Sequence, residues 1–591
     1  MIKKTYFTAF AILAFAAISP AQQLGLKQQV EVAFSIIPQE KVYVHYNTPL
    51  LFAGEYLYYK FYCMNAQTNE MSRVSKIGYV TLVSNRNETV FTHKIDLVNG
   101  LGQGDYFIPT TVPTGQYKLL AYTQWMQNEG IDYFYQDDVN IINPYKSTEI
   151  EFLEGGDTEE ATMLKELNIA ETRRNNSATV KTTLAFGYLN PTYGKRENVK
   201  MALEGIDEEI TGGNYSVSVR KIDSINFLSR YSAIDFFGRD RRERKIETNP
   251  TKIHLPELRG DLLSGQVVSN VNGKPLPGGK VALSIPGSNY TFKVASCDDN
   301  GVFHFNLYKD YEKVNAYVQL LGGSSEEARI VLDDEASLDY TKLSFTNGFR
   351  ISSDIETHII DRSIYNQAEN AYFTIKPDTI LEVKINHPFY GLLATSYNLD
   401  DYTRFITSKE VFVEIINNAW LSQDNDGNQV FRIREKDPTN DSKLLPLLLI
   451  DGILVQDHQE LIDYDARKIQ HIHIVRDKYY LGSQVFQGII SIETIDSQYS
   501  QRFSNSRVMT IELTQPQQRK KYFNQIYKGD SNTRVPDFRS QLFWEPNFNI
   551  EDTLTEIEFY TSDNTGNYEI CLEGFTNSGK PITLKKIFSV R

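Results

Sequence analysis

Between residues 40 and 126, short strands rich in tyrosine and phenylalanine follow one another with turn residues between them. Residues 41–46 alternate in polarity, Asn47-Thr48-Pro49 marks a turn, and residues 55–62 form a second aromatic strand. Broad rings pack well on a half-buried pleated surface, and aromatic residues make up 12% of the chain. This pattern predicts a seven-stranded β-sandwich of about 100 residues, which we place at residues 30–145.

Five short strings stand at distinctive positions of this first unit. They are an entering strand, a corner proline, the start and middle of a long strand, and a late turn: Glu40-Lys41-Val42-Tyr43-Val44-His45, Pro49, Ala53-Gly54-Glu55, Lys60-Phe61-Tyr62 and Pro113-Thr114-Gly115-Gln116-Tyr117. Together they resemble the second macroglobulin-like domain of the α-2-macroglobulin family. The resemblance implies an immunoglobulin-like sandwich at this place.

The chain then changes character. Residues 146–175 run from acidic to basic with few aromatic residues, so we predict a linker with a short helix at 159–167. A second β-rich unit follows at 176–240 and is similar to another macroglobulin-like module. The basic cluster at 239–245 could be a docking patch for an acidic partner, but its interspersed acidic residues favour a solvated linker.

Strand alternation returns at residues 258–335. A strand at 262–268 and a strand at 281–285 precede Asp299-Asn300-Gly301, a tight turn that leads into an aromatic strand. The series resembles the carboxypeptidase regulatory-like domain, a small sandwich whose name implies no peptidase activity. A C-terminal β-sandwich of macroglobulin-like character is predicted at 505–591.

Residues 345–425 lose the strand alternation, within a unit that we place at 345–500. Apolar side chains at 409–421 recur at helical spacing and predict an amphipathic helix. A strand that ends in Asp451-Gly452 and strands at 469–476 and 488–494 follow. This order resembles the plug domain of TonB-dependent outer-membrane receptors. The whole series resembles envelope proteins of Bacteroidota, and the expected fold class is mainly β: serial immunoglobulin-like or macroglobulin-like β-sandwiches with one small α/β plug-like domain.

For both the plug-like and the macroglobulin-like resemblance, this chain lacks the part of the family that carries its best-known activity. A receptor barrel needs about 22 strands of about 10 residues each, and only 97 residues follow Thr494. Protease-trapping macroglobulins carry a thioester in a Cys-Gly-Glu-Gln string, which does not occur around Cys63, Cys297 or Cys571. We therefore expect neither a receptor barrel nor covalent trapping, and we expect the cysteines to be buried free thiols.

The N-terminus predicts export. Lys3 and Lys4 precede an apolar run at 6–18 and small residues that end at Ala21, so residues 1–21 are expected to be a signal peptide. No cysteine follows that would carry a lipid, and no later stretch predicts a membrane span. The formal charge of −14 gives no electrostatic reason to bind nucleic acid or an anionic lipid surface.

Candidate catalytic and metal-binding sets are weak. His254 and Glu257 have the H-x-x-E spacing of zinc carboxypeptidases, with His358 or His387 as a distant third ligand, but Pro256 and the inter-domain position favour a linker. His471 and His473 would share one face of a strand and could bind a metal with a third ligand, but an exposed strand face is the favoured explanation. The cluster Asp298-Asp299-Asn300-Gly301 lacks the spaced acceptors of a calcium loop.

The sequence therefore predicts no catalytic, cofactor-binding or metal-binding residue and no cofactor. We expect an exported, non-enzymatic structural or adaptor subunit, periplasmic or associated with the outer membrane. Its expected partners are an outer-membrane barrel protein or other envelope complex subunits in transport, secretion or outer-membrane assembly. A glycan- or peptide-binding protein, and a hydrolase with an unrecognised site, are the alternatives.

Overall fold

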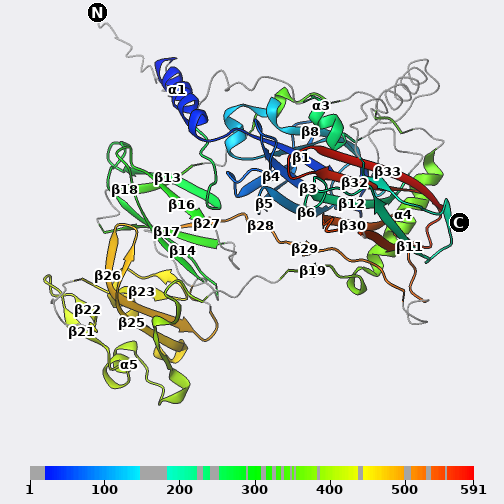
Figure 1. The fold of residues 1–591 in the computed structure, drawn as a ribbon. Helices are drawn as coiled ribbons and strands as arrows, with labels where there is room; N and C mark the ends of the chain where they lie inside the picture. The colour runs from blue at the N-terminus through cyan, green and yellow to red at the C-terminus, as the bar shows by residue number, and fades with distance from the viewer. Residues whose placement is uncertain are drawn as a thin grey trace, which may run out of the picture.

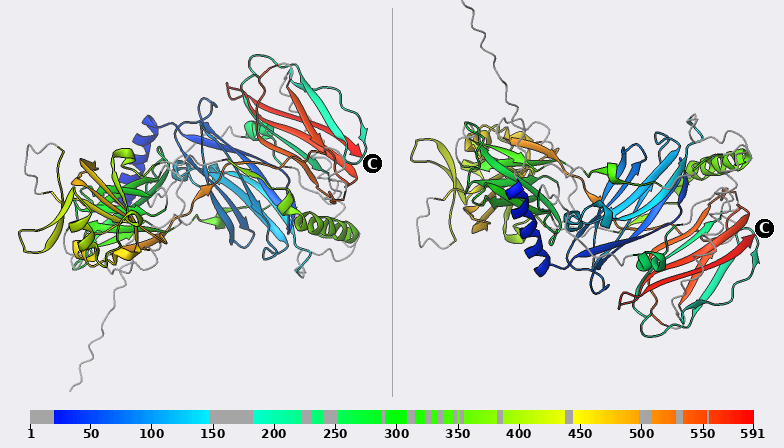
Figure 2. Two further views of the ribbon diagram at one scale, coloured as in Figure 1. Left: turned by 90° about the horizontal axis from the view of Figure 1, so that it is seen from below. Right: turned by 90° about the horizontal axis from the view of Figure 1, so that it is seen from above.

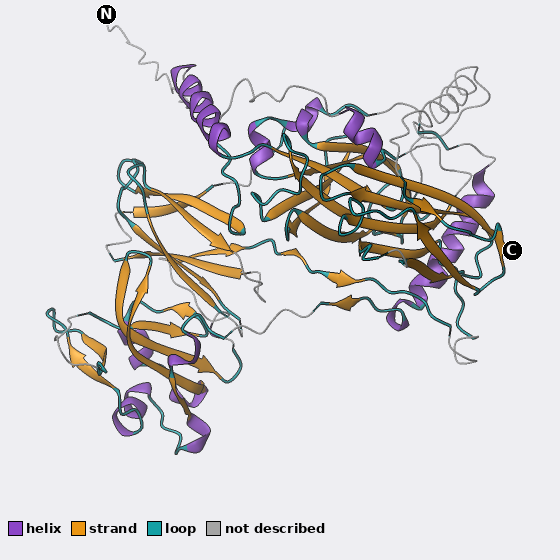
Figure 3. Cartoon of the chain, viewed as in Figure 1, coloured by secondary structure: helices purple, strands orange, loops and turns teal. Residues whose placement is uncertain are grey.

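The computed structural model describes most of the chain, namely residues 20–146, 183–222, 230–239, 252–287, 290–307, 315–322, 328–333, 338–345, 349–351, 355–381, 387–436, 444–497, 499, 508–527, 534–552 and 555–591. Strands dominate these residues, and the helices lie around the margins of the sheets (Figure 3), which confirms the predicted fold class. Nearly all of the predicted signal peptide, of the linker with its helix and of the basic cluster lies outside the described residues. Within the described ranges, no helix has both the length and the apolar character needed to cross a membrane.

The first sandwich encloses a core rich in tyrosine. One sheet consists of β1 (Glu40–Tyr46), β3 (Tyr56–Asn65) and β6 (Leu101–Phe107). The facing sheet consists, in spatial order, of β2 (Leu50–Phe52), β8 (Tyr135–Ile142), β7 (Gly115–Tyr122), β4 (Ile77–Ser84) and β5 (Thr89–Asp96). Tyr59 is fully buried between these two sheets, where its hydroxyl lies 2.8 Å from Nδ1 of His93. Tyr43 and Tyr62 are fully buried on the outer face of the first sheet, where both rings pack against Phe575.

Two helices cover the margins of the first sandwich. Helix α1 (Pro20–Ile36) places Phe34 edge-on against Trp125, with ring centroids 4.7 Å apart. Helix α3 (Ala233–Arg239) places Phe236 against Tyr43, with centroids 5.4 Å apart. Both helices therefore close the core through aromatic contacts.

A second sandwich is assembled from two distant parts of the chain. One sheet has the order β10 (Thr192–Tyr193), β33 (Pro581–Val590), β32 (Gly566–Phe575), β12 (Asn214–Lys221) and β30 (Gln541–Phe548). The other has the order β31 (Glu556–Tyr560), β11 (Asn198–Glu204) and β9 (Ala185–Phe186). We call this unit the split sandwich, and Figure 2 shows its early and late strands side by side.

The split sandwich corrects the prediction of two separate units at 176–240 and 505–591. Strand β12 lies between β32 and β30, so that Val217 is paired with Leu572 on one side and with Glu545 on the other. The residues of both segments share one apolar core. Alternation shows which face of a strand is buried but carries no information about its partner strand, so the sequence pattern could not join the two segments.

A small sandwich forms from residues 261–332 and one later strand. One sheet contains β16 (Val302–Leu307), β13 (Asp261–Ser269) and β18 (Ala328–Leu332). The other contains β15 (Thr291–Ser296), β14 (Lys280–Ile285), β17 (Asn315–Leu321) and β27 (Val508–Glu512). Strand β27 pairs with β17 although the sequence places it in the C-terminal unit, so the small sandwich extends beyond the predicted 258–335.

An α/β domain at residues 387–497 packs on the small sandwich. Its sheet has the order β20 (Thr395–Asn398), β25 (Ile469–Leu481), β26 (Gln484–Thr494), β23 (Leu447–Ile450) and β24 (Ile453–Leu454). Helix α6 (His458–Ile462) follows β24, and β21 (Ala419–Gln423) pairs with β22 (Gln429–Ile433). The predicted Asp451-Gly452 turn is present, with φ of 48° and 81° in the two residues, as a tight hairpin requires.

The predicted helix at 409–421 is correct only in its first half. Helix α5 (Ser408–Glu414) is held at its start by the capping box of Thr407 and Glu410. The chain then enters β21, so Trp420 lies on a strand and is 44% exposed. The stretch is rich in β-branched and aromatic residues, which have weak helix propensity, and pairing with β22 therefore prevails over helical spacing.

Residues 338–381, which we call the strap, lie outside the α/β domain and so correct its predicted start at 345. Phe349 and Ile355 share a buried cluster with Leu50 and Phe52 of the first sandwich. Helix α4 (Glu356–Ala371) follows, and β19 (Thr379–Ile380) pairs with β29 (Lys520–Lys521). Phe349 and Ile355 are therefore buried against a unit more than 200 residues earlier, whereas other apolar side chains of the strap, such as Ile364, are exposed.

The return segment, residues 513–527, leads from the small sandwich back to the split sandwich. Strand β28 (Pro516–Gln517) adds to β5 in parallel, and β29 then pairs with the strap. Figure 1 shows this segment running from the small sandwich toward the larger part of the molecule. Strap and return segment therefore connect the α/β end of the molecule to both larger sandwiches.

One core for residues 183–222 and 534–591 predicts that they unfold together. Leu572→Ala should destabilise the split sandwich by about 2–5 kcal/mol, because a fully buried side chain is lost. Hydrogen exchange should then accelerate in β11 and β12 as much as in β32. Ile587→Ala, on the neighbouring β33 but 59% exposed, should change stability by less than about 0.5 kcal/mol. Acceleration confined to residues 541–590 would contradict a shared unit.

Candidate functional site

The strap is fixed to both larger sandwiches by one buried carboxylate, Glu55. Its oxygens accept hydrogen bonds from Arg362 Nε and Nη2 at 2.8 and 2.7 Å, from Arg220 Nη2 at 2.9 Å and from Asn366 Nδ2 at 3.1 Å. The Arg362 guanidinium also lies over the ring of Phe52, 4.3 Å from its centroid. Burial alone would raise the pKa of Glu55, but Arg362 and Arg220 together lower it to about 2.

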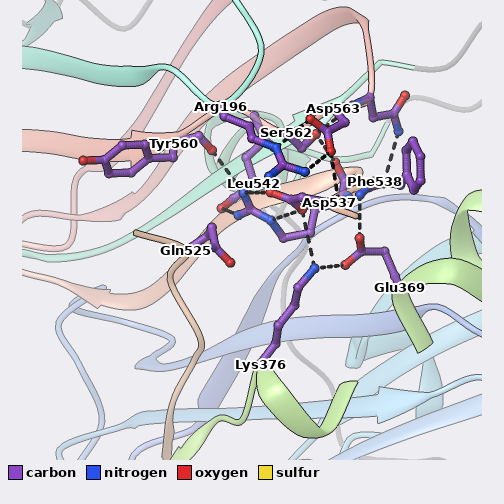
Figure 4. Close-up of polar contacts among 12 residues, drawn as sticks. Arg196, Glu369, Lys376, Gln525, Asp537, Phe538, Leu542, Tyr560, Ser562 and Asp563 are labelled. Atoms are coloured by element: carbon purple, nitrogen blue, oxygen red, sulfur yellow. Dashed lines mark hydrogen bonds and ion pairs between the residues drawn. The ribbon is translucent and has the colours of Figure 1, made fainter. Parts of the chain in front are cut away.

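A second set of ion pairs holds the end of the strap to the split sandwich (Figure 4). Lys376 Nζ lies 2.7 Å from Glu369 Oε2 and 3.6 Å from Asp537 Oδ1. Asp537 accepts two hydrogen bonds from Arg539, both at 2.7 Å. Burial would raise the pKa of Asp537, but Arg539 and Lys376 lower it to about 2. Each charged group of this second set therefore has a partner of opposite charge.

Between the two sets lies a cavity of about 150 Å³, which we call the junction pocket. Its walls come from the first sandwich, the split sandwich, the strap and the return segment. Aromatic side chains form much of the lining: Tyr56, Tyr58, Phe373, Tyr522, Phe523, Phe543 and Trp544. Its ionisable residues, apart from those tyrosines, are Glu55, Arg220, Glu369, Lys376, Asp378 and Arg539. A pocket with rings and a few converging polar groups is the usual form of a binding site.

The rings of the junction pocket are arranged around Tyr56 and Tyr58. These two rings stack with centroids 5.6 Å apart, and Phe373 of the strap stacks on Tyr56 at 5.9 Å. Tyr522 of the return segment meets Tyr58 edge-on at 5.1 Å, and Trp544 stacks with Tyr58 at 6.1 Å. Four segments that are distant in sequence therefore supply one aromatic wall.

Asp378 differs from the other charged groups of the junction pocket. Its carboxylate accepts a hydrogen bond from the Phe523 amide at 2.9 Å, but it forms no ion pair with any residue that the structure describes. Burial raises the pKa of Asp378 above its ordinary value. The nearby Lys520 is bound to Asp105, with Nζ 2.8 and 3.0 Å from the two carboxylate oxygens.

A buried polar cluster joins the first sandwich to the split sandwich but has a structural role. Arg230 binds both oxygens of Glu573 at 2.9 Å, and burial together with Arg230 lowers the pKa of His45 to about 3. The Nδ1 atom of His45 lies 2.6 Å from the Ser216 hydroxyl, which is also 2.8 Å from the hydroxyl of Tyr62. Because the cluster is inaccessible, it locks the two sandwiches rather than contacting a ligand.

A larger cleft of about 740 Å³ lies between the small sandwich and the α/β domain. Aliphatic residues and glycines dominate its lining, and the Nδ1 atom of its His458 already accepts the Phe431 amide at 2.9 Å. The junction pocket therefore has the richer set of ligand-binding groups.

The structure does not assemble a metal site around His254 and Glu257. The His254 amide is bonded to Asn128 at 3.0 Å, and Glu257 is buried and accepts the Tyr79 hydroxyl at 3.0 Å. His358 and His387 are exposed on the strap and at the start of the α/β domain. Among the described residues, no three histidine, cysteine, aspartate or glutamate side chains are grouped so that they could hold a metal ion.

The structure also places the remaining candidate residues of the sequence analysis. His471 and His473 do share a face of β25, and they lie 3.3 and 3.2 Å from the Glu493 carboxylate across the strand pair. Asp298 accepts the amides of Asn300 and Val302 at 2.8 Å, so it closes a tight turn as predicted. The three cysteines are buried and free, which confirms the prediction of free thiols.

Comparisons with known proteins identify no family. No protein-family model and no curated protein matches the chain. Solved structures similar to it include a Salmonella alpha-2-macroglobulin (9% identity, 94% of this chain, 40% of that chain, TM-score 0.23). They also include the native Escherichia coli alpha-2-macroglobulin (8%, 93%, 40%, TM-score 0.23) and its trypsin-activated form (8%, 94%, 42%, TM-score 0.23). The chain spans about 40% of the length of these proteins.

The residues of the junction were not identified as a site by sequence analysis. Glu55 belongs to the macroglobulin-like string, but its partner Arg362 is 307 residues away. Asp378 and Trp544 follow no motif. A lone arginine on the buried face of α4 is the available signal, because a buried arginine needs a carboxylate partner.

Replacing the central carboxylate should loosen the strap. Glu55→Gln leaves Arg362 and Arg220 without a buried counter-charge, which should cost about 3–5 kcal/mol. Hydrogen exchange in α4 should accelerate, whereas Glu356→Gln, at an exposed position of the same helix, should leave it unchanged. Equal protection of α4 in both variants would show that Glu55 does not anchor it.

Glu257 should make stability depend on pH near neutrality. Burial and the nearby Asp261 raise its pKa from 4.5 to about 8, so the folded protein keeps a proton that the unfolded chain releases. Stability should therefore fall as pH rises from about 4.5 to about 8, by at most about 1.4 kcal/mol per pH unit. Glu257→Gln should remove this slope in urea titrations, and the exposed Glu551→Gln should retain it. Identical slopes in the two variants would refute this assignment.

Proposed function

We propose that this chain is a non-enzymatic structural or adaptor subunit that works by binding other proteins. The interlocked sandwiches support this proposal. Glu55, Arg230 and Lys376 each join segments from different units through buried or half-buried ion pairs. Such connections suit a stiff body that holds a binding end at a fixed distance.

The single observation that carries the proposal is the exposed apolar surface of the α/β domain. This domain lies at the end of the molecule away from the C-terminus (Figure 1). Leu392 is 84% exposed, Ile406 64%, Val413 66% and Trp420 44%. These exposed apolar side chains are the candidate contacts of the α/β domain with a partner protein.

The proposed place of action rests on the predicted signal peptide and on the plug-like resemblance. We propose that the protein is exported to the periplasm or to an outer-membrane complex, where the α/β domain contacts a barrel-containing protein. A complex in transport, secretion or outer-membrane assembly would present such a barrel. The proposed contact with a barrel-containing protein rests on three elements of the α/β domain. They are the strand that ends in Asp451-Gly452, helix α6 and the strand that closes at Thr494.

The two alternatives, a glycan- or peptide-binding protein and a hydrolase, have less support. Of the three tryptophans, all among the described residues, Trp125 and Trp544 are buried, so they cannot form an exposed glycan-binding platform with Trp420. For a hydrolase, His254, His358 and His387 lie on separate elements. His471 and His473 lie beside Glu493 on one strand face, and none of the described pockets brings these histidines together.

The proposed contact can be tested by crosslinking in the native host. A photoreactive amino acid at Val413 should form an adduct with an outer-membrane barrel protein, whereas the same group at Lys200, exposed on the split sandwich, should not. The double variant Ile406→Asp and Val413→Asp should lose the barrel protein from detergent-solubilised complexes, because charges replace exposed apolar contacts. Recovery of the unmodified protein only as a free monomer would refute the proposal.

A further inference from the structure

The junction pocket is lined by three carboxylates, of which Asp378 alone forms no ion pair with a residue that the structure describes. Among its lining residues, Glu55 is matched by Arg220 and by the adjacent Arg362. Lys376 and Arg539 are matched by Glu369 and by the adjacent Asp537. Asp378 remains, since it forms no ion pair with a described residue and its one hydrogen-bond donor is the neutral amide of Phe523.

The remaining carboxylate lies beside the aromatic wall. Asp378 lines the same pocket as Tyr56, Tyr58 and Phe373, and its charge is close enough to act on both tyrosines. The faces of aromatic rings carry negative potential and attract cations within about 6 Å. A carboxylate next to such faces therefore offers two attractive contacts to one positive group.

The entrance and size of the pocket suit a single cationic group on a short stem. Asp378, Tyr56 and Tyr58 are half-buried and Phe373 is exposed, so these groups can be reached from solvent. A cavity of about 150 Å³ is the size of a known engineered cavity that binds benzene, a ligand of roughly six non-hydrogen atoms. The end of a lysine or arginine side chain has about this size.

We propose that the junction pocket binds an alkylammonium or guanidinium group, with Asp378 as its counter-ion and Tyr56, Tyr58 and Phe373 as its aromatic walls. The group could be carried by a lysine or arginine side chain of a partner protein or by a free small amine. The pocket does not depend on the proposed contact of the α/β domain. Because its walls come from the strap, the return segment and both larger sandwiches, an occupied pocket would also stabilise their junction.

The proposal can be tested by calorimetry on the full chain. The probes are Nα-acetyl-arginine methylamide and Nα-acetyl-lysine methylamide, compared with the citrulline and norleucine analogues, which have similar shapes without the charge. The cationic probes should bind about tenfold or more tightly than the neutral ones, because both the ion pair and the ring contacts require the charge. Equal binding of the arginine and citrulline probes would overturn the proposal.

Variants locate the binding to the pocket. Asp378→Asn keeps a hydrogen-bond acceptor for the Phe523 amide but removes the charge, and it should weaken the arginine probe about tenfold. Phe373→Leu removes an exposed aromatic face and should weaken binding severalfold. Glu556→Gln, an exposed carboxylate on β31, should have no effect. If Asp378→Asn, with an unchanged melting temperature, binds the probe as well as the unmodified protein, the cation is not bound here.

A further comparison of probes distinguishes a partner protein from a free small amine as the source of the cation. Agmatine carries the guanidinium group without a peptide, and a pentapeptide with a central arginine carries it within a chain. Tighter binding of the peptide would assign the pocket to a partner protein, and tighter binding of agmatine would assign it to a free amine. In both cases Asp378→Asn should abolish the preference for the cationic over the neutral probe.

Discussion

The pairing of β12 with β32 and β30 is the constraint on which the rest of the structure depends. It joins residues 214–221 to residues 541–575 and thereby closes a loop of about 320 residues. The entropic cost of closing a long loop grows only slowly with its length, by about 0.6 kcal/mol per doubling, so a buried shared core can offset it. The small sandwich, the strap and the α/β domain are all contained in this loop.

The return segment is the end of this loop that leads back to the split sandwich. The strap lies in the middle of the loop, between the small sandwich and the α/β domain, and meets the return segment at β19 and β29. Charged groups are placed where the segments cross. Glu55 is satisfied by arginines from two other units, and Asp537 is satisfied by Arg539 and by Lys376 of the strap. A buried charge without its partners is strongly destabilising, so these pairs fix the crossing points.

The same crossing creates the junction pocket. Rings from four segments meet there, and Asp378 is the lining carboxylate that forms no ion pair with a described residue. The α/β domain, in contrast, lies at the end of the molecule, and its Leu392 and Val413 are exposed. The molecule therefore offers a polar and aromatic pocket within its body and an apolar surface at its end. These two features differ in chemistry and suit different ligands.

The sequence by itself determined the local structure: alternation located the strands of the first sandwich, and Asp451-Gly452 marked a hairpin. These features depend on neighbours within a few residues, which local patterns record. Tertiary structure decided which distant strands and side chains become partners. It placed β12 beside β32, converted residues 419–421 from predicted helix to strand, and moved the strap from the α/β domain to the first sandwich. It also brought Arg362 to Glu55 and Asp378 to Tyr56, because alternation and charge show that a side chain needs a partner but not which distant residue will supply it.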